Sequence, residues 1–208
     1  MYGTCGHGSQ GLLDCGALYS YKHIEPLIPM RAFALALALS CFTLPVLADD
    51  AASPRPAGCD SFTWDVAREL ALLQTDATRL AGGNGREVVR IVPGHLYRVT
   101  LHPQADVDLA ARPGKPMLDD DAMAGLLTFQ VPVDGRYRVA ITTGHWIDVV
   151  DAGRIVASLD FQGRRGCPLV HKIVEFELAA GRDLVLQFAG GHDAEAGVAI
   201  TSVDTPAR

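Results

Sequence analysis

The chain has 208 residues, with 18 Lys or Arg against 24 Asp or Glu, so its formal net charge at pH 7 is −6. Hydrophobic residues make up 49% and charged residues 20% of the sequence, a balance that excludes a disordered tail, a coiled coil and a collagen-like fibre. An acidic chain also lacks the concentrated basic face that phosphate contact needs, so nucleic acid is not an expected partner.

Residues 30–48 have the pattern of a signal peptide. A basic start at Met30-Arg31 precedes an apolar stretch that ends with small side chains at Val46 and Ala48. We predict cleavage after Ala48, which places the mature protein in the periplasm or outside the cell and leaves no membrane span. The alternative is an anchor that is retained, but the 17 residues of segment 32–48 are at the short end of what crosses a bilayer.

The remaining chain is expected to divide into three parts. Residues 1–29 show no periodicity and precede the signal-like segment, so we interpret them as an over-extended start, with Met30 as the true first residue. Residues 49–60 contain two prolines and are predicted to be a flexible tether. Residues 61–208 have the length of one domain, which we predict to be a single β-sandwich.

Only two of the five cysteines, Cys59 and Cys167, lie outside the segment that we expect to be removed. In an exported protein an isolated pair of this kind predicts a disulfide. It would close a loop of more than a hundred residues, which the chain-entropy description values at roughly 4–5 kcal/mol. Cysteine catalysis is the alternative, but neither cysteine has a clear histidine partner nearby in the sequence.

The hydrophobic pattern predicts one helix followed by strands. Val66, Leu70 and Leu73 recur at helical spacing, so we expect a helix over about residues 64–74. After it the period changes to two. The segments that alternate, or that are apolar on both faces, are 97–101, 124–133, 137–141, 145–151, 155–161, 170–178, 184–188 and 198–200.

Turn-forming pairs such as Ala152-Gly153 separate these segments, and Val131–Tyr137, with Asp134-Gly135 at its centre, is the clearest predicted hairpin. Eight or nine short strands without alternating helices predict a mainly β fold. We expect an antiparallel β-sandwich of jelly-roll or Ig-like type with one short N-terminal helix.

One charged side chain falls on a predicted core face. Lys172 shares its face with Val170, Val174 and Phe176, and a buried ammonium needs a carboxylate partner. Asp148 is the candidate, which predicts an internal ion pair between Asp148 and Lys172. The alternatives are a lysine that reaches solvent at the strand end and a catalytic lysine.

Three histidines could contribute to a metal site. His145, His171 and His192, with Glu175 or Asp193, could provide two histidines and one carboxylate for iron, or a zinc site. However, His171 and Glu175 on one strand would have Cβ atoms ~13 Å apart, too far for one ion. Histidines that face solvent are the alternative, and they are the interpretation we favour.

An acidic run could hold a hard cation. Asp119, Asp120 and Asp121 are consecutive, and their oxygens could bind Ca²⁺, although three neighbouring carboxylates without EF-hand spacing are more typical of a solvated loop. We therefore expect no cofactor, with calcium at this run or a transition metal at the histidines as the open alternatives.

Several packing patterns resemble known proteins. They are the segments Gly135–Val139, Trp146–Val150, His171–Phe176 and Leu184–Phe188, together with Cys167. This layout resembles small exported proteobacterial proteins of unassigned function, and also the β-sandwiches of pre-peptidase C-terminal and carbohydrate-binding type. The resemblance covers about residues 124–203. It implies a module that binds or stabilises, and it carries over no functional residue.

Two functions are therefore considered. The favoured one is an exported, non-catalytic binding or accessory module of the cell envelope, whose partner is an envelope ligand or protein. Exposed aromatic residues on one sheet would support carbohydrate binding, and a face without them would count against it. The alternative is a small metal-dependent periplasmic enzyme, for example a mononuclear iron oxygenase, that uses the clustered histidines.

Overall fold

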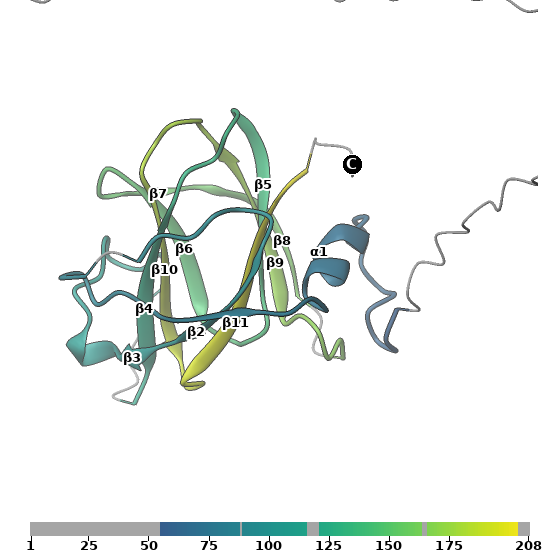
Figure 1. Ribbon diagram of the computed structural model, residues 1–208, viewed down its shortest axis with the longest axis horizontal. Helices are drawn as coiled ribbons and strands as arrows, with labels where there is room; N and C mark the ends of the chain where they lie inside the picture. Colours follow the sequence, from purple (N-terminus) through teal and green to yellow (C-terminus); the bar gives the residue numbers. More distant parts are fainter. Residues whose placement is uncertain (1–54, 88, 116–120, 164–165, 204–208) are drawn as a thin grey trace, which may run out of the picture. The chain divides into compact units, whose positions relative to one another are not determined.

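The strands form two sheets that pack face to face (Figure 1). The computed structural model describes residues 55–87, 89–115, 121–163 and 166–203, all within the unit Asp50–Arg208. The expected start, the signal peptide and most of the expected tether lie outside the described residues and stay predictions. Among the described residues, no helix has the length and apolar character to cross a membrane.

The helical elements are α1 (Ala67–Leu72) and a short 3-10 turn, η1 (Gln104–Asp106). The strands are β1 (Thr78–Ala81), β2 (Leu96–Thr100), β3 (His102–Pro103), β4 (Met123–Phe129), β5 (Gly135–Ile141), β6 (Trp146–Asp151), β7 (Arg154–Val156), β8 (Ser158–Gly163), β9 (Lys172–Leu178), β10 (Leu184–Gly191) and β11 (Glu195–Ser202).

The strand order identifies the sandwich as a jelly roll. One sheet has the order β1-β2-β11-β5-β9-β8 and the other β3-β4-β10-β6-β7. From the β6–β7 hairpin outward, β5 pairs with β9, β4 with β10 and β2 with β11, as in one long hairpin wound around itself. The predicted β-sandwich with one short helix is therefore confirmed, and of the two expected types the strand pairing selects the jelly roll.

The main core lies between the two sheets. Each strand contributes alternate residues to it, as the two-residue period predicts. Its largest fully buried side chains include Tyr137, Phe129, Phe176, Phe188, Leu127 and Ile141. This core positions both sheets, and therefore the loops that connect them at each end.

One expectation about the strands is wrong. Residues 131–137 do not form a hairpin, because β4 and β5 belong to different sheets and the connection crosses between them. The antiparallel pattern also has an exception, because β1 pairs with β2 in parallel. The tight hairpin joins β6 and β7 instead. Ala152 (φ 48°) and Gly153 (φ 77°) are the two left-handed residues of its type I′ turn.

The helix is shorter than expected, and it covers the outer face of the six-stranded sheet (Figure 1). Directly before it, the Asp65 carboxylate accepts a hydrogen bond from the Ala67 amide, 3.0 Å, as in an Asx turn. Its buried residues join a second cluster with the outer face of the sheet. This cluster contains Cys59, Val66, Leu70, Leu73, Leu96, Ala140, Cys167, Val170, Ile173 and Ala199.

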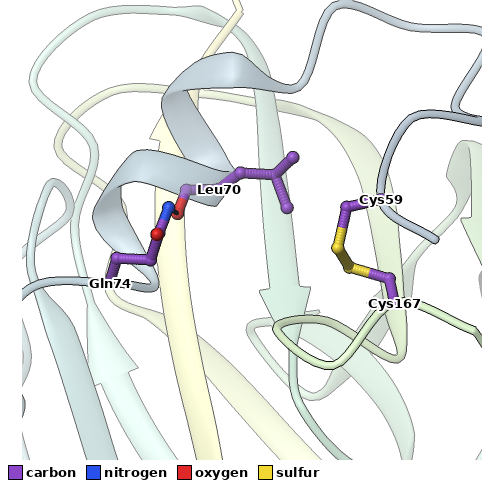
Figure 2. Close-up of a disulfide and its surroundings, with 4 residues drawn as sticks. All are labelled: Cys59, Leu70, Gln74 and Cys167. Carbon is purple, nitrogen blue, oxygen red and sulfur yellow. Dashed lines mark hydrogen bonds between the residues drawn. A yellow bond between two sulfur atoms is a disulfide. The ribbon is translucent and has the colours of Figure 1, made fainter. Parts of the chain in front are cut away.

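The disulfide between Cys59 and Cys167 closes this second cluster, as predicted. The two residues are 108 positions apart in the sequence, and both are buried. Figure 2 shows Leu70 pointing from α1 toward the disulfide, with the Gln74 side chain donating to the Leu70 carbonyl at 2.9 Å. The covalent link therefore fixes the segment before the helix to the loop before β9.

A buried ionic network also attaches the helix to the sheet. Glu69 on α1 accepts a hydrogen bond from Thr201 on β11, 2.7 Å, and lies 3.7 Å from Arg138 on β5. Arg138 also donates to Glu175 on β9, 2.9 Å, and lies on the Trp64 ring. Each of the two buried carboxylates therefore has the charged and hydrogen-bonding partners that a buried charge needs.

Candidate functional site

The strand pairing brings the three candidate histidines to one end of the sandwich. His145 directly precedes β6, and Trp146 pairs with Ala189 of β10, so the turn that contains His192 lies at the same end. His171 directly precedes β9, and its amide donates to the Ile141 carbonyl at the end of β5, 2.8 Å. We call this end, formed by residues 104–115, 142–146, 166–172 and 191–194, the loop end.

His145 is buried inside the loop end, with an exposed fraction of 0%. Its Nδ1 is hydrogen-bonded to Thr143 Oγ1 at 2.8 Å, and its ring meets Phe188 edge-on. Its Nε2 has no hydrogen-bond partner in the part of the chain that the structure describes. Gly191 lies against the ring so closely that a Cβ there would be 2.5 Å from it.

The environment of His145 disfavours its charged form. Burial lowers its pKa most, and the positive charges of Lys172 and His192 lower it further, while Asp193 raises it. The imidazole is therefore neutral in the fold at neutral pH.

The other two histidines have different surroundings. His171 is half-buried, while His192 is exposed and its Nδ1 lies 3.4 Å from the Asp121 carboxylate. Within the described ranges, no group of three His, Cys, Asp or Glu side chains has the arrangement of a metal site. The fold therefore brings the predicted histidines to one end without arranging them as a ligand set.

The carboxylates considered as ligands are placed elsewhere or are exposed. Glu175 pairs with Arg136 and Arg138 under the helix, away from the loop end. Asp193 and Asp121 are exposed at the loop end. Asp119 and Asp120 of the expected calcium site lie outside the described residues, so that site stays a prediction.

Asp148 attaches a long loop to the outer face of the five-stranded sheet. Its carboxylate accepts hydrogen bonds from the Trp146 indole at 2.9 Å, the Gly114 amide at 3.3 Å and the Gln187 side chain at 3.3 Å. Gln187 in turn accepts a bond from the Ala111 amide, 3.1 Å. Asp148 and Gln187 thus hold residues 111–114 against the sheet. The same hydrogen bonds give these two buried polar side chains the partners that they need.

Lys172 occupies the core face at the end of β9, where the sequence placed it, and is half-buried. Its ammonium nitrogen lies 5.3 Å from the centre of the Trp146 ring. Its ammonium does not come within 4.0 Å of the Asp148 carboxylate, so these two described residues do not form the expected direct ion pair. Trp146 contacts both residues instead, with its face toward Lys172 and its N–H toward Asp148.

The surroundings make Lys172 an unusual lysine. Burial lowers its pKa to about 8, Asp148 raises it, and the nearby Lys115 lowers it. An amine with this pKa is part neutral and part charged in a mildly alkaline solution. Its cationic form is stabilised by the indole face and by the field of Asp148.

The sequence analysis missed Trp146 and Lys115 as members of this group. Trp146 was identified only as part of a strand, and Lys115 is in a loop without periodicity. One signal could have found Lys115, because Lys115 and Lys172 are the two lysines of residues 49–208. Lys172 lies over the Trp146 ring, and Lys115 follows Gly114, which lies close to that ring.

The loop end offers no aromatic platform for stacking sugar rings. In the described parts of the chain, Phe161 is the aromatic residue with a largely exposed side chain, 65%, and it lies on the edge strand β8. By the criterion stated above, this counts against carbohydrate binding through a row of aromatic side chains.

Comparisons with known proteins add little to this geometry. No family description matches the sequence, and no curated protein matches it. Among solved structures, the chain is similar to the pre-peptidase C-terminal domain of a collagenase from Bacillus anthracis. The sequence identity is 9%, the match covers 55% of this chain and 94% of that chain, and the TM-score is 0.32. The fold assignment therefore rests on the strand pairing described above.

Proposed function

We propose that this chain is an exported, non-catalytic binding module of the cell envelope that contacts its ligand at the loop end. The observation that carries the proposal is the half-buried pair of Trp146 and Lys172. Asp148 and Gln187 are occupied by holding the loop, whereas the Lys172 ammonium has no acceptor among the described residues. Keeping such a cation costs stability, and ligand contact is a function that would offset this cost.

Export is supported by the signal-like residues 30–48 and by the disulfide, which persists in oxidising compartments. The test is fractionation of cells that express the full chain, followed by mass analysis of the purified protein. We expect an N-terminus at Asp49 in the periplasm or medium. A membrane-bound product that retains segment 32–48, or any peptide from residues 1–29, would contradict this part of the proposal.

Binding at the loop end is tested by amide NMR spectra of the mature protein titrated with soluble peptidoglycan fragments, lipopolysaccharide core fragments and periplasmic extract. We expect shifts confined to residues of the loop end. Trp146→Leu should abolish them. Val92→Ala is the matched control, because Val92 lines a groove at the opposite end, with Arg90 and Gln130, and should leave them unchanged. No shifts, or shifts outside the loop end, would contradict the proposal.

A metal-dependent enzyme is the second candidate, and the unpartnered Nε2 of His145 is the observation that favours it. A zinc or iron ligand would use such a nitrogen. Elemental analysis of protein purified without a tag decides the matter. One equivalent of iron, copper or zinc that is lost in His145→Gln would support the enzyme, and a metal content below a tenth of an equivalent would exclude it.

A further inference from the structure

The chain uses its two kinds of cation differently. It contains fifteen arginines and three lysines, and residues 49–208 contain only Lys115 and Lys172. Between described residues, and apart from the contact of His192 with Asp121, the side-chain ion pairs all use arginine: Arg55, Arg79, Arg90, Arg98, Arg136, Arg138 and Arg182. Neither lysine contributes to these pairs, so the two lysines are not part of the ionic framework of the described fold.

The segments that carry the two lysines both approach the Trp146 indole. The Lys172 ammonium lies over the Trp146 ring. Lys115 directly follows Gly114, whose amide donates to Asp148 and where an added Cβ would lie 3.6 Å from Cζ2 of Trp146. The two lysines therefore belong to different segments, β9 and the loop 104–115, and the loop approaches Trp146 at Gly114, directly before Lys115.

Asp148 does not neutralise the lysines by contact. Its two oxygens accept bonds from Trp146, Gly114 and Gln187, and the bond from Gly114 attaches the loop to the sheet. Two neighbouring ammonium groups, one of them half-buried, repel each other in the unbound protein. A negative group placed between them would remove the repulsion and provide the acceptor that Lys172 lacks.

We propose that Lys115 and Lys172 form an anion site beside Trp146, which binds the carboxylate or phosphate group of the module's ligand. This inference rests on the proposed function, because it names the chemistry of the ligand bound at the loop end. Lysine suits the role because its ammonium is a compact point charge on a flexible stem, which can reach an anion that the rigid guanidinium fork would have to meet at a fixed angle.

The site should release its anion as Lys172 loses its proton. The charged groups that act on this amine are Asp148 on β6 and Lys115 on the loop, and the titratable His145 before β6, neutral at neutral pH, is also near. Because burial and Lys115 outweigh Asp148, the pKa of Lys172 in the unbound protein is about 8. A bound anion favours the charged amine and raises this pKa, and by linkage the anion affinity falls about tenfold per pH unit once the free amine is neutral.

The small number of lysines makes the test direct. Reductive ¹³C-methylation of the mature protein gives signals from Lys115, Lys172 and the α-amino group alone, and Lys115→Arg assigns them. The pH titration of the Lys172 signal is measured at constant ionic strength with acetate, with inorganic phosphate, and with acetamide as the uncharged match of acetate. We expect acetate or phosphate to move the midpoint from about 8 toward about 9, and acetamide to leave it unchanged.

The two anions distinguish a carboxylate ligand from a phosphate ligand, and a response to either supports the inference. An unchanged midpoint with both anions, or an equal change with acetamide, would overturn it. Lys172→Arg should keep anion binding at pH 10, where the native chain loses it, and Lys172→Met should lose it at every pH. Arg86→Met, in an exposed turn, is the control for removal of one positive charge.

The outcome of the anion titration can be distinguished from the outcome of the test of the proposed function. If envelope fractions shift the loop-end amides while neither anion affects Lys172, the anion site fails and the binding module stands. If the anions move the Lys172 midpoint while no envelope fraction shifts the loop end, the anion site stands and the proposed function fails.

Discussion

Glu69 and Thr201 are 132 residues apart in the sequence, yet the Thr201 hydroxyl donates to the Glu69 carboxylate at 2.7 Å in a buried contact. The hydrogen bond joins the helix to the last strand. It also orients a carboxylate that faces Arg138 at 3.7 Å. The attachment of α1 therefore depends on polar contacts as well as on its apolar face.

Replacing Thr201 by Val should lower the free energy of unfolding by about 1–3 kcal/mol, because the volume is conserved while a buried carboxylate loses a donor. Urea denaturation monitored by circular dichroism measures the change. Thr100→Val, at an exposed position of β2, is the matched control and should change stability by less than about 0.5 kcal/mol. Equal effects of the two variants would show that the hydrogen bond contributes nothing.

Removing the disulfide with the double substitution of Cys59 and Cys167 by Ala should lower the free energy of unfolding by about 2–5 kcal/mol, since the unfolded chain loses a crosslink across 108 residues. Denaturant titration of the oxidised native chain and of the double variant gives the difference. Reduction of the native chain should produce a loss of similar size. A double variant as stable as the oxidised native protein would disprove this expectation.

Gly191→Ala should destabilise the protein by about 1–3 kcal/mol, because the new Cβ would be placed 2.5 Å from the buried His145 ring. Gly166→Ala is the matched control, since nothing lies within 4 Å of a Cβ built there. Thermal unfolding of the two variants makes the comparison. If Gly191→Ala has the same melting temperature as the native protein, the packing of the loop end is looser than described.

The depressed pKa of His145 makes the fold sensitive to acid. Its pKa is below 6.5 in the folded chain because of burial, and close to 6.5 when unfolded. As the pH falls below about 6.5, the unfolded chain takes up this proton first. The stability contributed by the neutral imidazole is therefore present above this pH and is lost below it.

We expect the free energy of unfolding of the native chain to fall more steeply between pH 6.5 and 5 than that of His145→Gln. Denaturant titrations at several pH values measure both slopes. His95→Gln, which changes an exposed histidine that does not affect the pKa of His145, serves as the control and should keep the native slope. Parallel profiles for native protein and His145→Gln would contradict the assignment.

Lys172→Met should stabilise the protein at pH 7, because it removes a half-buried ammonium from the core face. The amine titrates near pH 8 in the fold and at about 10.5 when unfolded, so the native chain gains stability as the pH rises between these values. The advantage of Lys172→Met should therefore shrink from pH 8 to pH 10.5. A variant less stable than the native chain at pH 7 would show that the ammonium supports the fold.

Local pattern and composition predicted much of the fold. The two-residue period identified strands such as 137–141 and 184–188, because each side of a strand faces either the core or its surroundings. The disulfide followed from two cysteines in a chain expected to be exported. The predicted hairpin at 131–137 was wrong because a turn sequence fixes a change of direction and does not specify whether the next strand joins the same sheet.

The contacts that define the candidate site could not be predicted in this way. Asp148 meets Gly114 and Gln187 across 34 and 39 residues, and such pairs depend on which strands become neighbours. Lys172 was identified because a charge on a core face violates the pattern. Lys115 violates no pattern, and the approach of its loop to Trp146 at Gly114 is seen only in the structure.

The position of β11 determines when its sheet can form during synthesis of the chain. This last strand lies between β2 and β5, in the interior of its sheet, and pairs with both (Figure 1). The sheet therefore cannot close until Glu195–Ser202 has been synthesised. A nascent chain lacking these residues would present two unpaired strand edges, which other chains can join. Folding of this sheet must therefore await the emergence of residues 195–202 from the ribosome.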